Sequence, residues 1–241
     1  MLRLLRSLRI WAASLLLVLL WVPLVALVRL FDFHPLRLRT ARCFRRLGKA
    51  LRAVNPWQVR ISGQDGFDPR RTYVIVSNHQ SFVDIPVISH LAIDTKWLAK
   101  AELFAVPGFG WMMRMAGDIP VRRSDRRSSA RAVLRSAKYL RDGCSVVFFP
   151  EGTRSPDGRV LRFNDGPFQL AIREGVPVLP LVVSGSGEAL PRDSWHFGPP
   201  REIELRVLPA VATEGLTTKD THQLQESVRE MIANGLRGAG F

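Results

Sequence analysis

Cysteine is scarce in this sequence, in which Cys43 and Cys144 are the only cysteines among 241 residues. One pair cannot make the disulfide framework of a small secreted protein, and neither cysteine has a neighbour with metal-ligand spacing. Cys144 lies in the apolar run CSVVFF, so we expect it to be packed in the core. The five histidines are also too scattered to suggest a metal site. We therefore expect no metal ion.

Acidic residues are few as well. Asp and Glu number 21 against 35 Lys and Arg, which gives a net charge of +14. Almost all of this positive charge is arginine. A charge of this size indicates an anionic partner, either nucleic acid or anionic lipid, although a base composition rich in arginine codons also raises the count. The sequence has no helix-turn-helix, zinc-binding pattern or basic-aromatic repeat, which argues against nucleic acid.

The longest uncharged run is IWAASLLLVLLWVPLVALV, residues 10–28. As a helix it is nearly long enough to cross a bilayer core. The sequence at its C-terminal end, LVRLFDF, lacks the small residues of a signal-peptide cleavage site, so we expect the segment to be retained. Basic residues flank both ends, which leaves open a single crossing or a half-inserted segment that bends near Pro23. The heavier basic cluster follows the run and places the remaining chain on the cytoplasmic side.

Residues 35–54, PLRLRTARCFRRLGKALRAV, predict a helix with arginines between apolar positions. This helix can lie on anionic headgroups, or its basic face can simply be solvated. We assign residues 1–55 to a membrane-anchoring, basic interfacial segment and residues 56–241 to the main domain. We find no internal repeat and no long low-complexity linker.

The main domain alternates between strand and helix patterns, which predicts an α/β fold. We expect a mostly parallel or mixed central sheet flanked by helices, preceded by a hydrophobic membrane helix or helical hairpin. The prolines in 177–183 suggest a strand start or an edge strand. The arginine-rich stretch 121–135 predicts an exposed loop that runs into a helix. The predicted strands are 57–62, 72–77, 144–149, 177–183 and 202–208, and the predicted helices are 128–143, 166–175 and 221–236.

The sequence NHQSFVD, residues 78–84, directly follows a predicted strand. Ligands of α/β sheets gather beyond the carboxyl ends of strands. If the chain turns into a helix here, Asp84 can reach the imidazole of His79 and fix its tautomer. The other ring nitrogen can then take a proton from a substrate hydroxyl. Without such a partner, His79 would be an ordinary structural histidine.

The sequence FPEGTRS, residues 149–155, also follows a strand. Its glycine lets the backbone approach a ligand, and arginine offers a planar fork for phosphate oxygens. Between the two motifs lie further basic residues that can neutralise a phosphate or can be solvated surface charges: Lys100, Arg122 and Arg123.

In this order, NHQSFVD, GDIPVR, FPEGTRS and VPVLPL resemble the glycerolipid acyltransferase family over about residues 57–210. The match is nearest to its bacterial 1-acylglycerol-3-phosphate acyltransferases. The resemblance implies that His79 is the general base and Asp84 its orienting partner. It implies that the lysolipid phosphate is bound by Lys100, Arg122, Glu151, Gly152, Thr153 and Arg154. Asp118-Ile119-Pro120 and Leu179 depart mildly from the family pattern.

The implied reaction moves a fatty acyl group from acyl-CoA or acyl-carrier protein to the sn-2 hydroxyl of lysophosphatidic acid, without a cofactor. It makes phosphatidic acid for phospholipid biosynthesis at the cytoplasmic face of a bacterial inner membrane. An acidic carrier protein would fit the arginine-rich stretch 121–135. Two alternatives remain. One is another acceptor, such as lyso-ornithine lipid or glycerol 3-phosphate. The other is a non-enzymatic, membrane-tethered binding or scaffold protein.

Overall fold

A computed structural model describes residues 1–238, and within them seven strands form one sheet in the order β1-β7-β6-β2-β5-β3-β4. Strands β6, β2, β5, β3 and β4 run parallel, β7 is antiparallel to β6, and β1 is parallel to β7. The mixed α/β sheet confirms the predicted fold class. The strands are β1 (Trp57–Ser62), β2 (Val74–Ser77), β3 (Thr95–Lys100), β4 (Ile119–Val121), β5 (Ser145–Phe148), β6 (Val178–Ser184) and β7 (Arg201–Val207).

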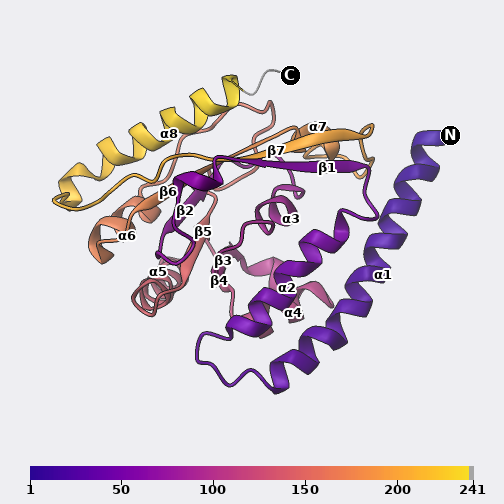
Figure 1. Ribbon diagram of the computed structural model, residues 1–241, viewed down its shortest axis with the longest axis horizontal. Helices are drawn as coiled ribbons and strands as arrows, with labels where there is room; N and C mark the ends of the chain where they lie inside the picture. The colour runs from indigo at the N-terminus through magenta and orange to yellow at the C-terminus, as the bar shows by residue number, and fades with distance from the viewer. Residues whose placement is uncertain (239–241) are drawn as a thin grey trace.

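Helices cover both faces of the sheet (Figure 1). One face is covered by α5 (Arg126–Arg141), α6 (Gly166–Glu174) and α8 (Thr221–Arg237), and α3 (Asp84–Ile88) packs on the other. Outside α3 lie α4 (Phe109–Ala116), α2 (Leu38–Leu51) and α1 (Leu2–Leu30). The short elements are α7 (Ser186–Ala189), η1 (Gln64–Gly66), η2 (Ala101–Ala105) and η3 (Thr218–Asp220).

The central strands are buried on both faces, as their continuous apolar sequences predict. Along β2, Val74 and Val76 pack towards α5, α6 and α8, while Ile75 packs towards α3. Strand β5 repeats this alternation with Val146 and Val147. Cys144, directly before β5, is fully buried and free, which confirms its predicted packing role.

Strands β3 and β4 and helix α4 were not among the predicted elements. The sequence of β3, TKWLAK, places Lys96 in the sheet, and this side chain is completely buried. Its ammonium group donates to the carbonyl oxygen of Ala116 at 2.6 Å and lies over the ring of Tyr139. Burial lowers the pKa of Lys96 to about 8. A buried lysine breaks the apolar pattern by which strands are recognised, and β4 is only three residues long.

The two prolines of 177–183 behave differently. Pro177 directly precedes β6, so the predicted strand start is confirmed. The edge position is wrong, because β6 lies between β7 and β2 and Pro180 is inside it. The carbonyl of Pro180 accepts from the N–H of Leu208, one residue beyond the end of β7. The missing N–H of Pro180 faces the same side, at the end of the regular pairing with β7, so the proline costs at most one bond at the end of that ladder.

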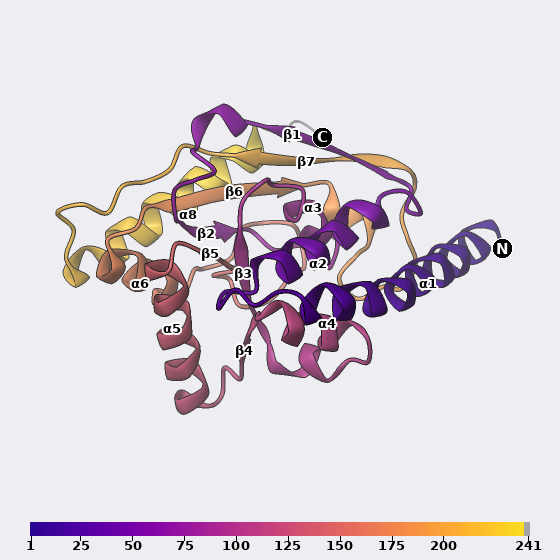
Figure 2. The same ribbon diagram turned by 60° about the horizontal axis from the view of Figure 1, so that its bottom comes forward.

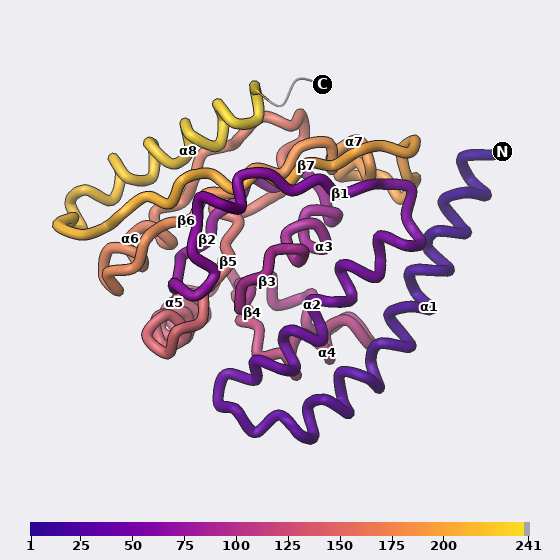
Figure 3. The backbone as a smooth tube through the Cα atoms, viewed as in Figure 1, coloured from indigo at the N-terminus to yellow at the C-terminus, as the bar shows by residue number. Residues whose placement is uncertain are grey.

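Helices α1 and α2 form an antiparallel hairpin at one side of the molecule, and the turn between them is easily followed in Figure 3. Figure 2 shows the N-terminal end of α1 reaching beyond α2. Helix α1 runs unbroken through Pro23, the residue near which one of the two open alternatives placed a bend. It is the one helix within residues 1–238 that is long and apolar enough to cross a membrane. Its outward face carries many leucines, which are more than 40% exposed: Leu4, Leu5, Leu8, Leu15, Leu16, Leu19, Leu20, Leu24 and Leu27.

The hairpin is fixed at both ends of α2. In the preceding turn, Asp32 accepts from the backbone N–H and the hydroxyl of Thr40, both at 2.7 Å, which satisfies donors at the start of the helix. Further along, Gly48 lets α2 approach α3. A Cβ at this position would lie 2.9 Å from the Cβ of Ser89 and 3.0 Å from the backbone of Pro86. Because α3 begins at Asp84, this contact also sets the position of that carboxylate.

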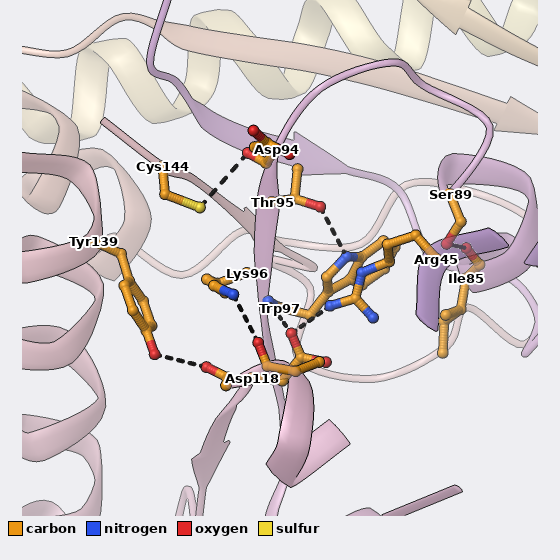
Figure 4. A network of polar contacts seen from close by, with 12 residues as sticks. Arg45, Ile85, Ser89, Asp94, Thr95, Lys96, Trp97, Asp118, Tyr139 and Cys144 are labelled. Atoms are coloured by element: carbon orange, nitrogen blue, oxygen red, sulfur yellow. Dashed lines mark hydrogen bonds and ion pairs between the residues drawn. The ribbon is translucent and has the colours of Figure 1, made fainter. Parts of the chain in front are cut away.

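A buried ion pair joins α2 to the sheet (Figure 4). Asp118, which is 2% exposed, accepts from the guanidinium of Arg45 and, at 3.0 Å, from the backbone N–H of Trp97. The guanidinium also lies over the indole of Trp97, 5.2 Å from the ring centroid. Asp118 therefore supplies the buried carboxylate that fixes Arg45.

Arg45→Met should lower the free energy of unfolding by about 3 kcal/mol, because it leaves the carboxylate of Asp118 buried without its cation. Replacing both partners, as Arg45→Met with Asp118→Asn, should recover most of this loss, since no buried charge then remains and the amide oxygen still accepts from the Trp97 N–H. Denaturant titration of detergent-solubilised protein measures both values. A double variant that is as unstable as the single one would contradict this reading of the pair.

Candidate functional site

The candidate site lies beyond the carboxyl ends of the parallel strands, as predicted. His79 follows β2, Glu151 and Arg154 follow β5, and Lys100 ends β3. Asn78 fixes the end of β2 against β6, because its side chain both donates to the carbonyl and accepts from the N–H of Val183, each at 2.8 Å. The residue that precedes His79 is therefore tied to the neighbouring strand.

The structure brings His79 and Asp84 together, with 2.7 Å between Nδ1 and Oδ2. The same oxygen accepts from the backbone N–H groups of Gln80 at 2.8 Å and Ser81 at 3.0 Å. A carboxylate oxygen with three donors around it requires that Nδ1 carries the proton. Nε2 of His79 then keeps its lone pair and can accept a proton. The Asp84 side chain is fully buried, whereas that of His79 is 14% exposed.

Three further contacts fix the orientation of His79. Its ring stacks on Phe149, with ring centroids 4.0 Å apart and 18° between the planes. Its backbone N–H donates to Glu151 Oε1 at 2.8 Å, and its carbonyl accepts from the N–H of Ser155 at 2.7 Å. The two motifs therefore hold each other in place. The sequence alone did not identify Phe149 as a positioning residue, although it begins the second motif.

The carboxylate of Glu151 binds backbone and does not line the cavity at His79. Besides His79, it accepts from the N–H of Leu161 at 3.0 Å. Burial raises the pKa of Glu151 to about 7, and the two backbone hydrogen bonds oppose that shift. The structure thus places Glu151 as a support for His79, whereas the sequence predicted a phosphate contact for it.

His79 opens into a cavity of about 580 Å³. A larger cavity of about 1110 Å³, between the start of α1 and residues 187–201, does not include His79, so the smaller one is the chemically relevant site. The polar lining consists of basic side chains and the carboxylates of Glu102 and Asp118. Apolar side chains form the remaining wall: Phe44, Phe82, Ile85, Trp97, Leu98, Ala99, Leu103, Val106, Phe109, Met113 and Phe149.

Four cations line this cavity. Arg45 is paired with Asp118, which leaves Lys100, Arg123 and Arg154 to bind a phosphate. Arg154 is held in place, because its guanidinium donates to the carbonyl of Arg192 at 2.8 Å and lies 4.2 Å from the ring centroid of Phe82. Arg122, the predicted phosphate ligand, instead lines a separate cavity with residues of α5. The neighbouring Arg123 reaches the site, and alternation along the chain after β4 explains why one of the pair faces away.

The turn of the second motif depends on Gly152, which has φ +76° and lines the cavity together with Thr153. This left-handed conformation favours glycine. A Cβ at Gly152 would also lie 3.4 Å from the Arg123 guanidinium. Within residues 1–238, no group of three or more Cys, His, Asp or Glu side chains has a metal-binding arrangement.

Residues 58–184 match the acyltransferase family. The chain is a member of this family. The matched region runs from β1 to the end of β6, so both motifs belong to the part of the fold that the family shares.

Several similar proteins share the name 1-acyl-sn-glycerol-3-phosphate acyltransferase. A chloroplast 1-acyl-sn-glycerol-3-phosphate acyltransferase of Brassica napus is 44% identical over 50% of this chain and 35% of its own length. The alpha form from Mus musculus is 36% identical over 73% of this chain and 62% of its own length. The chain thus spans about a third to two thirds of these relatives.

A solved structure is similar over nearly the whole chain. The crystal structure of the 1-acyl-sn-glycerophosphate (LPA) acyltransferase PlsC from Thermotoga maritima has a TM-score of 0.83 and 26% identity. The alignment covers 98% of this chain and 95% of that one, so it includes the N-terminal helices as well as the sheet.

The raised pKa of Glu151 predicts a pH-dependent loss of stability. A buried carboxyl that binds its proton more tightly in the folded state stabilises the protein while protonated, so this contribution disappears as the pH rises from about 4.5 to about 7. Glu151→Gln lacks the titration. Relative to this variant, the wild type should therefore lose unfolding free energy across that pH range. A constant difference in denaturant titrations at several pH values would show that Glu151 has an ordinary pKa.

Proposed function

We propose that the protein transfers a fatty acyl group from acyl-CoA or acyl-carrier protein to the sn-2 hydroxyl of lysophosphatidic acid, forming phosphatidic acid. The observation that carries the proposal is the His79–Asp84 pair at a cavity with cations at one part and apolar side chains at the other. A lysophosphatidic acid has the same two parts, a phosphate and an acyl chain. The names of the related proteins support this acceptor.

In the proposed reaction, the acceptor hydroxyl lies against Nε2 of His79. The imidazole takes the hydroxyl proton while the oxygen attacks the thioester carbonyl, and the Asp84 carboxylate stabilises the imidazolium that forms. The C–S bond of the tetrahedral intermediate then breaks, and the imidazolium returns its proton to the departing thiolate. Base catalysis of this kind contributes about 10²–10⁴-fold, and the rest comes from positioning and from stabilising the oxyanion.

The phosphate of the acceptor is assigned to Lys100, Arg123 and Arg154. Arg154 is already fixed by Arg192 and Phe82, so little side-chain freedom is lost when its guanidinium binds phosphate oxygens. In this assignment Arg123 replaces Arg122, and Glu151 acts through the backbone of His79 and not through the substrate.

The proposal places the protein at the cytoplasmic face of a bacterial inner membrane. The exposed apolar face of α1 supports contact with lipid hydrocarbon, and the basic α2 supports contact with anionic headgroups. Helix α2 also builds the site, since it contributes Phe44 and Arg45 to the cavity at His79. The bacterial setting is supported by the likeness to the Thermotoga maritima enzyme over almost its full length.

The acceptor can be tested by offering purified protein lysophosphatidic acid, lyso-ornithine lipid and glycerol 3-phosphate with a radiolabelled acyl thioester. We expect turnover of lysophosphatidic acid, and a KM for it that rises about tenfold in Arg154→Gln because a charge-assisted contact is lost. Arg122→Gln is the matched control and should leave this KM unchanged. Preference for lyso-ornithine lipid would retain His79 as the base but remove the phosphate role of Arg154.

The acyl donor can be tested at the start of α5, which begins just beyond β4 at the same edge of the sheet as His79. Arg126 and Arg127 are exposed there and attract an acidic carrier protein. Arg126→Glu with Arg127→Glu should raise the KM for acyl-carrier protein about tenfold and change that for acyl-CoA less. Arg173→Glu with Lys219→Glu changes the charge equally elsewhere and serves as the control. Equal effects on both donors would contradict carrier docking at this surface.

A further inference from the structure

A second cavity of about 580 Å³ lies at the opposite ends of the parallel strands from His79. Its lining includes Thr95 and Ser145, the first residues of β3 and β5. Arg45 contributes to both this cavity and the one at His79, and its guanidinium is bound to Asp118 on the catalytic side (Figure 4). The reaction proposed above makes no use of this second cavity.

The charge of this lining is strongly one-sided. Asp94 is its one carboxylate within the described chain, and it faces six basic side chains: Arg42, Arg45, Arg46, Lys49, Arg70 and Arg71. Cations that gather in one cavity repel each other, and a bound anion removes that repulsion. The lining therefore favours a ligand with more than one negative charge.

Half of these cations already have a partner in the protein. Arg42 forms a two-point contact with Asp94 at 2.7 and 2.6 Å, Arg45 pairs with Asp118, and Arg71 lies 3.2 Å from Glu214. The other three, Arg46, Lys49 and Arg70, make no ion pair or side-chain hydrogen bond with any part of residues 1–238. Their charges remain free for a ligand.

The three free cations approach from two sides. Arg46 and Lys49 are three residues apart on α2, which places them on the same face of the helix. Arg70 comes from the turn before β2, where its backbone N–H donates to Asp68 Oδ1 at 2.8 Å. Two guanidinium forks and one ammonium group around one space match the several oxygens and the double charge of a phosphate group.

We infer that this cavity is a second anion site, which binds a phosphate-bearing ligand. The phosphate can belong to the headgroup of an anionic lipid, which α2 would meet directly after the membrane helix α1, or to a soluble phosphate ester. The inference does not depend on the acyltransferase reaction, because the binding residues are separate from Lys100, Arg123 and Arg154.

The test compares wild type with Arg46→Gln/Lys49→Gln/Arg70→Gln and with the control Arg162→Gln/Arg173→Gln/Lys219→Gln, which removes equal charge from exposed sites outside the described cavities. Binding of inorganic pyrophosphate to the full-length protein in detergent is measured by calorimetry. Binding to vesicles of phosphatidylcholine, with and without phosphatidic acid, is measured by flotation. Lys100→Gln/Arg123→Gln/Arg154→Gln is introduced into all three proteins to remove the catalytic phosphate site, so that the measured binding comes from the second site.

We expect the cavity variant to bind pyrophosphate or phosphatidic acid vesicles at least about tenfold more weakly, while the control keeps wild-type affinity. Weaker binding of pyrophosphate by the cavity variant would indicate a soluble ligand. Weaker binding to the phosphatidic acid vesicles alone would indicate a lipid headgroup. Without ligand, the cavity variant should melt no lower than wild type, because like charges have been removed. Unchanged affinity for both probes, or equal losses in the cavity and control variants, would overturn the inference whether or not the protein transfers acyl groups.

Discussion

The geometry of the site depends on one oxygen atom, Oδ2 of Asp84, around which the imidazole of His79 and two backbone N–H groups converge. This arrangement folds residues 79–84 into a tight turn between β2 and α3. It also decides the tautomer of His79 and leaves Nε2 as the only ring nitrogen able to accept a proton. The same oxygen atom therefore holds the turn together and sets which nitrogen of His79 carries the proton. A change that moves Asp84 alters the base and the turn together.

The hairpin of α1 and α2 also helps to hold this site in place. Arg45 on α2 is tied to Asp118 beside β4, and Gly48 brings α2 against α3, where Asp84 is located. The basic helix α2 thus also forms a wall of the cavity at His79. In the proposed reaction the acceptor and the product are both lipids, and an apolar wall next to the hairpin would keep an acyl chain out of water, where each exposed methylene group costs free energy.

Much of this could be predicted from sequence, because the relevant signals are local. Continuous apolar strands, motifs at strand ends and the order of the motifs indicated the α/β fold, the pairing of His79 with Asp84 and the family. The errors concern long-range packing. A buried Lys96 concealed β3, and Pro180 is tolerated in a central strand because the pairing with β7 ends beside it. Sequence also could not show which of Arg122 and Arg123 faces the cavity, or that Glu151 binds backbone, since both depend on side-chain direction.

The most direct test of the account is the rate of acyl transfer by His79→Ala, measured under single-turnover conditions with lysophosphatidic acid and with added free imidazole. The account predicts a loss of about 10²–10⁴-fold in rate with an unchanged melting temperature, and partial recovery when imidazole supplies the missing base. It also predicts that Asp84→Asn, which keeps the imidazole but loses the carboxylate, is slowed without being rescued. Near-normal transfer by folded His79→Ala protein would contradict the assignment of His79 as the base.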